Sequence, residues 1–439
     1  MLYPSSSLVT SVAIAVLSGI TLITVMRGFK KTPREIFWRA FASKIKLIDA
    51  KDYARLSAQQ RAAAKYEMIV RDNRVFERIM KDGNLGLADG YVEGEWHSDN
   101  LQECLEKAIL HNKQIVSMLK VNAIALFAHY AKHRTSSRLR KLFGKYLNFG
   151  EARQQIEHHY DKMAKEELMD RMLGKYKIYT CAYFHEADMS LDEAQLAKMK
   201  LVALKLDLKP GMKVLDIGCG YGTLADYLAK TYGVEVVGVT LSKSQKKYAD
   251  THFGDNELID IQLIDYRKVT EETHGLFDRI YSVGMFEAIG RERYEEYFEK
   301  CDELLVRDGI MFIHTIGTNQ RIWRHKSFIN KYIFPGGELP NLASLSEKFS
   351  DKWILQDFQN FGMSYAKTLN CWKANIRDWR GLDDEVYDAR FRRVWTYYLD
   401  LTASGFVTES AMLWHLVYTK RHSLRFDNCD YMQRRVDVE

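Results

Sequence analysis

The sequence predicts an α/β protein whose larger part is a doubly wound, mainly parallel β-sheet. The first observation is an alternation of short apolar segments with amphipathic ones that begins near residue 192. We expect the apolar segments to be strands, at residues 214–217, 234–239, 261–265, 279–283 and 311–316. The second observation is GCGYG at residues 218–222, directly after the first of these segments. Strands that alternate with helices form parallel sheets, and glycines in the first turn let a nucleotide approach the backbone.

The composition fits a folded protein in a reducing compartment. With 439 residues, 46% hydrophobic and 12% aromatic, the chain can bury a sizeable core. Its net charge of +6 is modest. The sequence lacks a concentrated stripe of Lys and Arg with stacking aromatics, which argues against an enzyme that acts on nucleic acid. The 6 cysteines lie far apart and never form a Cys-x-x-Cys pair, so we expect neither a disulfide framework nor a metal site.

The first residues predict a membrane anchor. Residues 8–26 form an apolar, uncharged stretch of about 19 residues, close to the roughly 20 that a helix needs to span a bilayer. Basic residues follow it directly, at Arg27, Lys30, Lys31 and Arg34. A cleaved signal peptide carries its positive charge before the apolar run, and basic flanks stay in the cytoplasm. We therefore expect residues 1–34 to be a single-pass anchor with the catalytic part on the cytoplasmic side; a removed targeting segment is the alternative.

Two domains are expected after the anchor. Residues 35–150 predict a small, mostly helical domain that contacts lipid, because residues 57–65 are strong helix formers and residues 101–133 have helical apolar spacing. Glycines at 83, 86, 90 and 94 predict a turn-rich stretch at residues 83–96. The basic cluster at residues 132–145 suits either a membrane-surface helix or a solvated face. Residues 151–439 form the predicted catalytic domain, with an insertion near residues 321–349.

The surroundings of the glycines favour S-adenosylmethionine over other nucleotides. A dinucleotide site usually has an acidic residue at the end of the second strand, but this strand ends in VTLS at residues 239–242. No Gly-Lys-Ser/Thr sequence follows, which argues against a triphosphate loop. Asp216 instead precedes the glycines, where a carboxylate suits the positive amine and sulfonium of S-adenosylmethionine. Asp265, after the third strand, suits either the adenine amino group or a helix cap.

Several motifs together resemble those of the cyclopropane-fatty-acid synthases, including the mycolic acid cyclopropane synthases. They are LGLADGYVEGEW at 85–96, YTCAYF at 179–184, LDIGCGYG at 215–222, GVTLSKSQ at 238–245, HTIG at 314–317, YIFPGGELP at 332–340, DFQNFG at 357–362 and YYL at 397–399. Many methyltransferases share the glycine loop, whereas YTCAYF, HTIG and YIFPGGELP together are specific. The resemblance runs from about residue 75 to residue 418 and implies a Rossmann-like class I methyltransferase domain.

The resemblance implies transfer of a methyl group from S-adenosylmethionine to the cis double bond of an unsaturated phospholipid acyl chain. The alkene attacks the methyl carbon, and proton loss from the resulting carbocation closes a cyclopropane ring. Such a cation needs a dry, apolar pocket, and the family uses bound bicarbonate as the base. Relatives also imply a homodimer. The alternatives are methyl-branched or methylene products, another lipid such as a sphingoid base, or a membrane-tethered, non-catalytic relative that binds the cofactor.

The resemblance also implies the residues of two sites. The bicarbonate site would comprise Cys181, Glu287, His314, Ile316 and Tyr398. Backbone N–H groups of Cys181 and Ile316 would hold the anion with the side chains of His314 and Tyr398, and Glu287 would orient it. The cofactor site would comprise Tyr179, Thr180, Gly218, Cys219, Gly220, Thr240, Leu241, Gln245, Asp265 and Tyr266, with Asp216 at the methionine end and Val283 beside the adenosine.

The catalytic candidates also have structural interpretations. Cys181 suits a small buried position, Glu287 a cap for a helix near Arg291, and His314 a buried core position. Tyr398 belongs to an aromatic patch typical of a core and is preferred to Tyr397 because it precedes Leu399, as in the family.

Two motifs depart from the family. Residues 159–164 read HYDKMA where the family has HYDxGN, and residues 286–290 read FEAIG where it has FEHxG. We therefore expect this chain to differ from the family in two ways. The loop ahead of YTCAYF, the element that covers the active site in the family, would close differently, and either bicarbonate affinity or the product would change.

Overall fold

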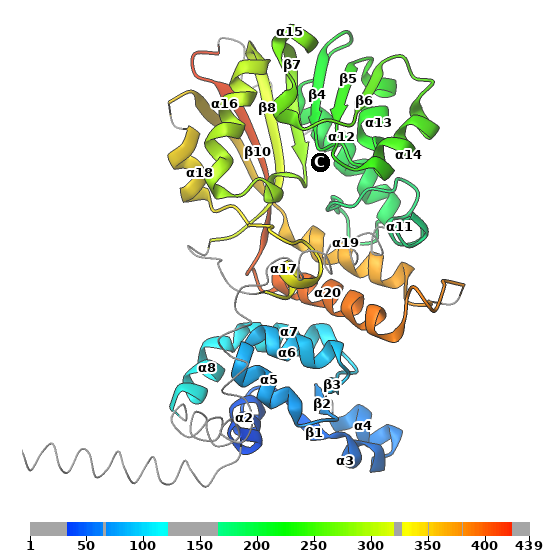
Figure 1. Ribbon diagram of the computed structural model, residues 1–439, viewed down its shortest axis with the longest axis vertical. Coiled ribbons are helices and arrows are strands. Elements are labelled where there is room, and N and C mark those ends of the chain that lie inside the picture. Colours follow the sequence, from blue (N-terminus) through cyan, green and yellow to red (C-terminus); the bar gives the residue numbers. More distant parts are fainter. Residues whose placement is uncertain are drawn as a thin grey trace, which may run out of the picture. The chain divides into compact units, whose positions relative to one another are not determined.

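The computed structural model of the chain (Figure 1) describes residues 33–64, 67–121, 166–319, 327–349, 351–379 and 381–423. The chain divides into two compact units. One comprises residues 1–158, 326–328 and 388–397, and the other comprises the remainder. In the described ranges, no helix has both the length and the apolar character to cross a membrane. The predicted anchor, the basic cluster at 132–145 and the HYDKMA segment lie outside the described residues.

The described part of the N-terminal unit is mostly helical and carries a small sheet that the sequence did not predict. In this sheet β1 pairs with β2 in parallel, and β2 pairs with β3 antiparallel. Its elements are α2 (Pro33–Ala42), β1 (Leu47–Asp49), α3 (Ala50–Arg55), α4 (Ala58–Ala64), β2 (Met68–Val70), α5 (Arg74–Asp82), α6 (Asn84–Val92), β3 (Trp96–His97), α7 (Leu101–Leu110) and α8 (Asn112–Val121).

The predicted turn-rich stretch at residues 83–96 is wrong for most of its length, because residues 84–92 form helix α6. Only Gly83 and Gly94 have positive φ angles, of 58° and 74°. The other two glycines serve close packing against α5. A Cβ on Gly86 would lie 2.0 Å from the Arg78 carbonyl oxygen, and a Cβ on Gly90 would lie 2.8 Å from the Val75 side chain.

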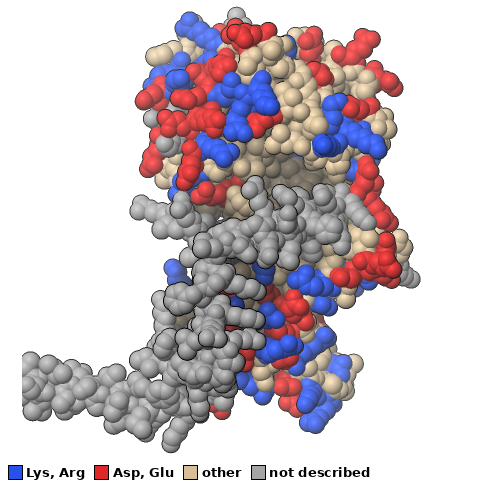
Figure 2. Space-filling view, viewed as in Figure 1, with Lys and Arg blue, Asp and Glu red and all other residues tan. Residues whose placement is uncertain are grey.

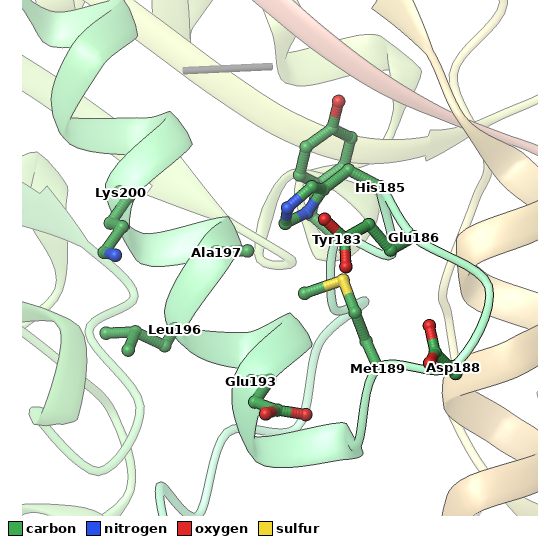
Figure 3. Close-up of a pocket in the computed structure, with 9 residues that line it drawn as sticks. All are labelled: Tyr183, His185, Glu186, Asp188, Met189, Glu193, Leu196, Ala197 and Lys200. Atoms are coloured by element: carbon green, nitrogen blue, oxygen red, sulfur yellow. The ribbon is translucent and has the colours of Figure 1, made fainter.

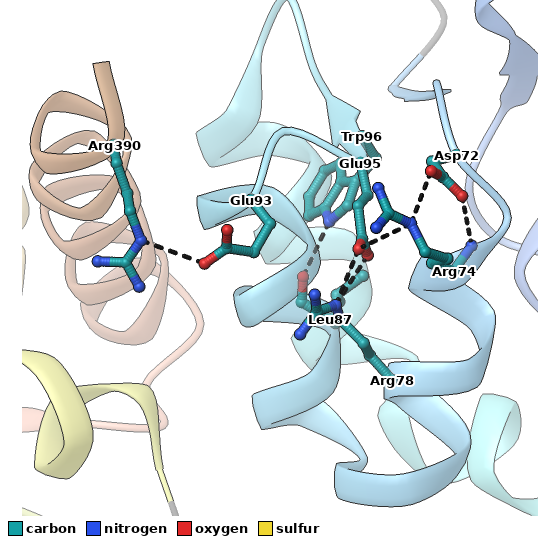
Figure 4. Close-up of polar contacts among 8 residues, drawn as sticks. All are labelled: Asp72, Arg74, Arg78, Leu87, Glu93, Glu95, Trp96 and Arg390. Atoms are coloured by element: carbon teal, nitrogen blue, oxygen red, sulfur yellow. Dashed lines mark hydrogen bonds and ion pairs between the residues drawn. The ribbon is translucent and has the colours of Figure 1, made fainter. Parts of the chain in front are cut away.

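A buried carboxylate fixes the segment after α6 (Figure 4). The Glu95 side chain is 1% exposed and accepts hydrogen bonds of 2.9 and 3.0 Å from the Arg78 guanidinium. The adjacent indole of Trp96 donates to the Leu87 carbonyl at 2.8 Å, and Glu93 pairs with Arg390 at 3.2 Å. A buried charge is stable only when it is paired, so Glu95 holds β3 against α5 and α6.

The second unit is built on a seven-stranded sheet in the order β6-β5-β4-β7-β8-β10-β9. The strands from β6 to β8 are parallel, and β10 runs antiparallel to both β8 and β9. The strands are β4 (Lys213–Ile217), β5 (Glu235–Val239), β6 (Ile259–Gln262), β7 (Phe277–Val283), β8 (Leu305–Gly317), β9 (Trp353–Asn360) and β10 (Met412–Lys420).

Helices flank this sheet on both faces (Figure 1). The helices in the chain from residue 166 onward are α11 (Glu166–Leu173), α12 (Leu191–Leu206), α13 (Thr223–Tyr232), α14 (Lys243–Phe253), α15 (Glu271–His274), α16 (Tyr294–Leu304), α17 (Phe328–Tyr332), α18 (Leu342–Phe349), α19 (Gly362–Asn375) and α20 (Ala389–Val407), with short 3-10 turns η1 (Tyr266–Lys268), η2 (Phe286–Ala288) and η3 (Arg291–Arg293). Side chains alternate across the sheet. Leu215 and Ile217 of β4 join a core with α16, whereas Val214 joins a core with α12 and α13. Around this unit, Figure 2 shows acidic and basic side chains interspersed on the visible face.

The predicted doubly wound, mainly parallel sheet is confirmed, and all five predicted strands exist. The third is displaced: β6 ends at Gln262, three residues before Asp265. The insertion near 321–349 contains α17 and α18 in its described part.

Candidate active site

The glycine loop after β4 forms an open cradle at the carboxyl edge of the sheet. Gly218, Gly220 and Gly222 have φ angles of 87°, 57° and 84°, which strongly favour glycine. A Cβ on Gly218 would lie 2.6 Å from Met285, whereas a Cβ on Gly220 would meet nothing within 4 Å. The N–H groups of Gly218 and Cys219 both donate to the Val239 carbonyl, at 3.0 and 3.1 Å. The loop is therefore held to β5 and leaves room above Gly220 for a ligand.

The residues predicted after β5 adjoin this loop. Thr240 and Gln245 bond to each other through their side chains at 2.8 Å, and the Ser242 N–H donates to Thr240 Oγ1 at 3.1 Å. Leu241 is 74% exposed, and an apolar side chain so exposed at a ligand edge is available to cover an adenine ring.

Asp265 has the capping role that was left open for it. Its carboxylate accepts the Arg267 N–H at 3.0 Å and pairs with the Arg267 guanidinium at 2.6 Å, which lowers the carboxyl pKa. The neighbouring Tyr266 ring packs against Tyr297 with centroids 5.6 Å apart, and Val283 ends β7. Contact of these three residues with adenosine stays a prediction.

Asp216 lies beneath the glycine loop and is 2% exposed. Burial raises the pKa of its carboxyl group to about 7, while the Tyr281 hydroxyl and the Lys198 ammonium act in the opposite direction. Burial likewise lowers the pKa of Lys198 to about 7. The two buried groups each favour the charged form of the other, and direct contact of Asp216 with the cofactor stays a prediction.

The YTCAYF segment is held in place by buried polar groups of α12. Lys198 Nζ donates to Thr180 Oγ1 at 2.9 Å, and Gln195 Nε2 donates to the Thr180 carbonyl at 3.0 Å. Both side chains are 0% exposed. Cys181 is also fully buried, and burial raises the pKa of its thiol. A raised pKa favours the protonated thiol, which is a weak nucleophile.

Glu287 does not cap the turn at Arg291; its carboxylate Oε1 accepts the Ile316 N–H at 2.6 Å. The other oxygen, Oε2, is buried without a hydrogen-bond partner among the described residues, and burial raises the pKa of the carboxyl group. A hydrogen bond thus joins Glu287 on η2 to Ile316 on β8. The Ile316 N–H, which was expected to hold bicarbonate, is already occupied by this carboxylate.

His314 is a buried histidine with one nitrogen occupied. It is 1% exposed, and its Nδ1 lies 2.8 Å from Nε2 of His415, its neighbour on β10. Burial and the nearby Lys198 charge lower its pKa well below the ordinary value, so the imidazole is neutral. Within the described chain, no hydrogen bond engages Nε2, which leaves that nitrogen for a ligand.

The two adjacent tyrosines of α20 have different contacts. The Tyr398 hydroxyl accepts a hydrogen bond from the Tyr179 hydroxyl at 3.0 Å. Tyr397 instead packs against Tyr91 and Phe328, with ring centroids 5.2 and 4.8 Å apart. The Tyr398 hydroxyl thus contacts a residue of the predicted cofactor site, and the catalytic role of Tyr398 stays a prediction.

Tyr365 of α19 was not predicted, although three of the catalytic candidates lie near it. Burial raises the pKa of its hydroxyl well above the ordinary value, and the nearby Tyr398, Cys181 and Glu287 raise it further. Its ring stacks on Phe406 at 4.6 Å. No motif marks Tyr365 in the sequence, and only its aromatic character adjoining DFQNFG could have indicated it.

A surface cavity of about 590 Å³ lies beside YTCAYF and shares no residue with the predicted sites (Figure 3). Its lining is mixed: Glu186, Asp188 and Glu193 are acidic, Lys200 is basic, and the other residues include Met189, Leu196 and Ala197. Charged, solvated walls do not suit an acyl chain or a carbocation, so this cavity is not assigned to the reaction.

Comparison with known proteins decides the family. A family model described as mycolic acid cyclopropane synthetase matches residues 148–416, more than half of the chain. The chain belongs to this family. The cyclopropane-fatty-acyl-phospholipid synthase of Escherichia coli (strain K12) is 36% identical over 365 residues, which cover 82% of this chain and 89% of the relative.

Two further comparisons agree. Cyclopropane mycolic acid synthase 1 of Mycobacterium tuberculosis (strain CDC 1551 / Oshkosh) is 34% identical over 274 residues, 57% of this chain and 93% of the relative. The solved structure of mycolic acid cyclopropane synthase CmaA1 complexed with SAH and CTAB superimposes with a TM-score of 0.54 at 30% identity, over 61% of this chain and 98% of that one. As a member of the mycolic acid cyclopropane synthetase family, the chain is an S-adenosylmethionine-dependent methyltransferase of the cyclopropane-fatty-acyl-phospholipid synthase type, with a Rossmann-like class I fold.

Proposed function

We propose that the chain adds a methylene group across the cis double bond of unsaturated acyl chains in membrane phospholipids. The observation that carries the proposal is the buried Glu287 carboxylate, in a chain of this family: Oε1 accepts the Ile316 N–H at 2.6 Å, and Oε2 has no hydrogen-bond partner among the described residues. S-adenosylmethionine supplies the methyl group, and bicarbonate supplies the base that takes up the proton lost on ring closure.

The cofactor fits the glycine cradle. Gly220 leaves open space for a ligand, and the exposed Leu241 adjoins the same edge. The fixed YTCAYF segment brings Tyr179 and Thr180 toward β7, because Thr180 Cγ2 lies 2.5 Å from where a Cβ on Gly284 would stand. These elements would hold the donor at the carboxyl edge of the sheet, where ligands bind in open α/β folds.

Two orphaned polar groups support a small anion with one proton. The Cys181 N–H is buried and has no hydrogen-bond partner in the described residues, and Glu287 Oε2 is buried without one. A buried polar group without a hydrogen bond destabilises the fold. The N–H needs an acceptor and the carboxylate oxygen needs a donor, so the two groups together favour a ligand that can both accept and donate a hydrogen bond. Bicarbonate has both capacities. The Ile316 N–H joins this site only if Glu287 releases it.

Aromatic side chains would keep the reaction dry. The Tyr179 ring lies 5.1 Å from Trp372 and 6.3 Å from Phe334, and Phe334 lies 6.2 Å from Tyr398. These π-faces exclude water from a developing cation and stabilise it. The hydrogen bond from Tyr179 fixes the Tyr398 hydroxyl in this apolar surrounding.

The test of the base is bicarbonate dependence. The purified chain is assayed with vesicles of mono-unsaturated phosphatidylglycerol in buffer freed of carbon dioxide. We expect product formation to fall and to recover when sodium bicarbonate is added, while an equal concentration of sodium chloride has no effect. A rate independent of bicarbonate would contradict the assignment of the base and leave the methyl transfer standing.

The membrane location is part of the proposal. The apolar residues 8–26 and the basic residues after them support a single-pass anchor, with the methyltransferase on the cytoplasmic side. An anchored enzyme would meet its acyl chains in the bilayer to which it is fixed.

A further inference from the structure

Lys177 is a buried cation outside the predicted sites, two residues before Tyr179. It is 4% exposed, and its backbone has a φ angle of 50°, a left-handed conformation that is uncommon for residues with a side chain. A buried lysine in such a conformation is held there by specific contacts.

The Lys177 ammonium contacts two other parts of the cofactor site. It lies 4.6 Å from the ring centroid of Tyr221, in the glycine loop, and 4.1 Å from that of Tyr248, on α14. The two rings meet edge to face, with centroids 5.1 Å apart. Thus one ammonium joins the segment before YTCAYF to the glycine loop and to the helix that follows Thr240 and Leu241.

Acidic residues of α11 complete the arrangement. Asp170 forms an ion pair with Lys177, and Glu166 lies 3.7 Å from its ammonium. Both acidic side chains are more than half exposed, at 55% and 66%. Their attraction is therefore partly screened by water, and the two partly buried rings add cation–π contacts with the same ammonium.

We propose that Lys177 is a positioning residue for the cofactor, which clamps the YTCAYF segment to the glycine loop and α14. Three segments predicted to hold S-adenosylmethionine meet at this ammonium. Its removal leaves each segment folded but frees them to move independently, so cofactor affinity falls. The proposal rests on cofactor binding alone and does not depend on which lipid is methylated.

The test is calorimetry of the full chain with S-adenosylhomocysteine. Lys177→Met nearly keeps the length of the side chain and removes the charge, and we expect about tenfold weaker binding from the loss of two cation–π contacts. The melting temperature should change little, because Asp170 and Glu166, which lose their partner, are more than half exposed and stay hydrated. Lys177→Arg keeps the cation and should restore most of the affinity.

Lys230→Met is the matched control, since Lys230 is 61% exposed and its ammonium lies 5.9 Å from the Phe253 ring. It should bind S-adenosylhomocysteine like the unmodified chain. In turnover, Lys177→Met should raise the KM for S-adenosylmethionine and leave kcat at saturation nearly unchanged. Unchanged affinity in Lys177→Met would overturn the proposal. If that variant melts early, Tyr248→Leu decides: weakened binding at a normal melting temperature supports the clamp, and normal binding overturns it.

Discussion

Glu287 is the residue whose environment says most about the reaction. One carboxylate oxygen is bonded to the Ile316 N–H, and the other is buried without a partner in the described chain. A buried, half-satisfied carboxylate is costly for stability, and such groups occur where function requires them. Sequence motifs alone could name Glu287, but its bond to Ile316 depends on how η2 approaches β8 and could not be predicted.

Glu287→Gln should separate activity from stability. A folded-state pKa raised above the unfolded value contributes stability at low pH, which is lost as the pH rises through the folded pKa. At neutral pH the ionised carboxylate therefore costs stability, and the neutral amide relieves this cost. We expect the melting temperature to hold or rise, while product formation falls by about 10²-fold or more. The exposed Glu303→Gln is the control, and retained activity in Glu287→Gln would remove Glu287 from the mechanism.

His314 should make the fold sensitive to acid. Because its pKa is depressed in the folded state, the histidine contributes stability above the unfolded pKa, and this contribution is lost as the pH falls toward the folded pKa. The unmodified chain should therefore melt at lower temperature as the pH falls from about 7.5 to about 5, and His314→Asn should show a smaller decrease. His422→Asn, at an exposed turn with φ of 67°, should keep the full decrease. An equal decrease in both variants would show that the acid sensitivity arises elsewhere.

At the scale of elements, the pairing of β8 with β10 positions the catalytic candidates His314 and Ile316. Their antiparallel register brings His415 opposite His314 and Leu413 opposite Ile316. The apolar pattern predicts β8. Its pairing with β10, a strand about 100 residues later, could not be predicted from the local sequence. The buried Gln195 and Lys198 of α12 were missed for a related reason. Polar residues on a helix usually face solvent, and only their contacts with Thr180 reveal their role.

Gly317 tests how tightly β8 packs on β10. A Cβ at this position would lie 2.2 Å from ring carbons of Trp414, so an alanine must displace a fully buried indole. Gly317→Ala should cost about 1–3 kcal/mol of unfolding free energy, measured by urea denaturation. Gly405→Ala, in α20 with its nearest contact at 3.9 Å, should gain about 0.5–1 kcal/mol because alanine favours the helix. A stable Gly317→Ala variant would mean that β10 can shift away from β8.

For the whole molecule, sequence periodicity predicted the sheet better than the N-terminal unit. Five strands that alternate regularly with helices allow few topologies for the catalytic domain. In the N-terminal unit, the glycines at 83–96 predict turns, yet Gly86 and Gly90 lie inside α6. They are glycines because α5 packs so closely there that no side chain fits. The burial of Tyr365 could not be predicted, since no motif marks it and it depends on tertiary packing such as the contact with the Phe406 ring at 4.6 Å.

The proposed anchor can be tested by a change of polarity. Ile14→Arg with Leu17→Arg places two charges in the apolar stretch, each costing about 2.5–3.5 kcal/mol in a membrane helix. We expect the chain to move from the membrane fraction to the supernatant after ultracentrifugation. The conservative pair Ile14→Leu with Leu17→Ile should remain with the membrane. If the charged variant also stays there, another part of the chain provides the attachment.

The most direct test of the central claim is mass spectrometry of lipids from a bacterial host that lacks cyclopropane lipids and expresses this chain. The account predicts phospholipids whose unsaturated acyl chains gain the mass of one methylene group and then resist catalytic hydrogenation, with no such species in cells that express Glu287→Gln. Unchanged acyl chains beside normal S-adenosylhomocysteine binding would contradict it and indicate a relative that only binds the cofactor. A mass gain in chains that still take up hydrogen would instead show a methylene product.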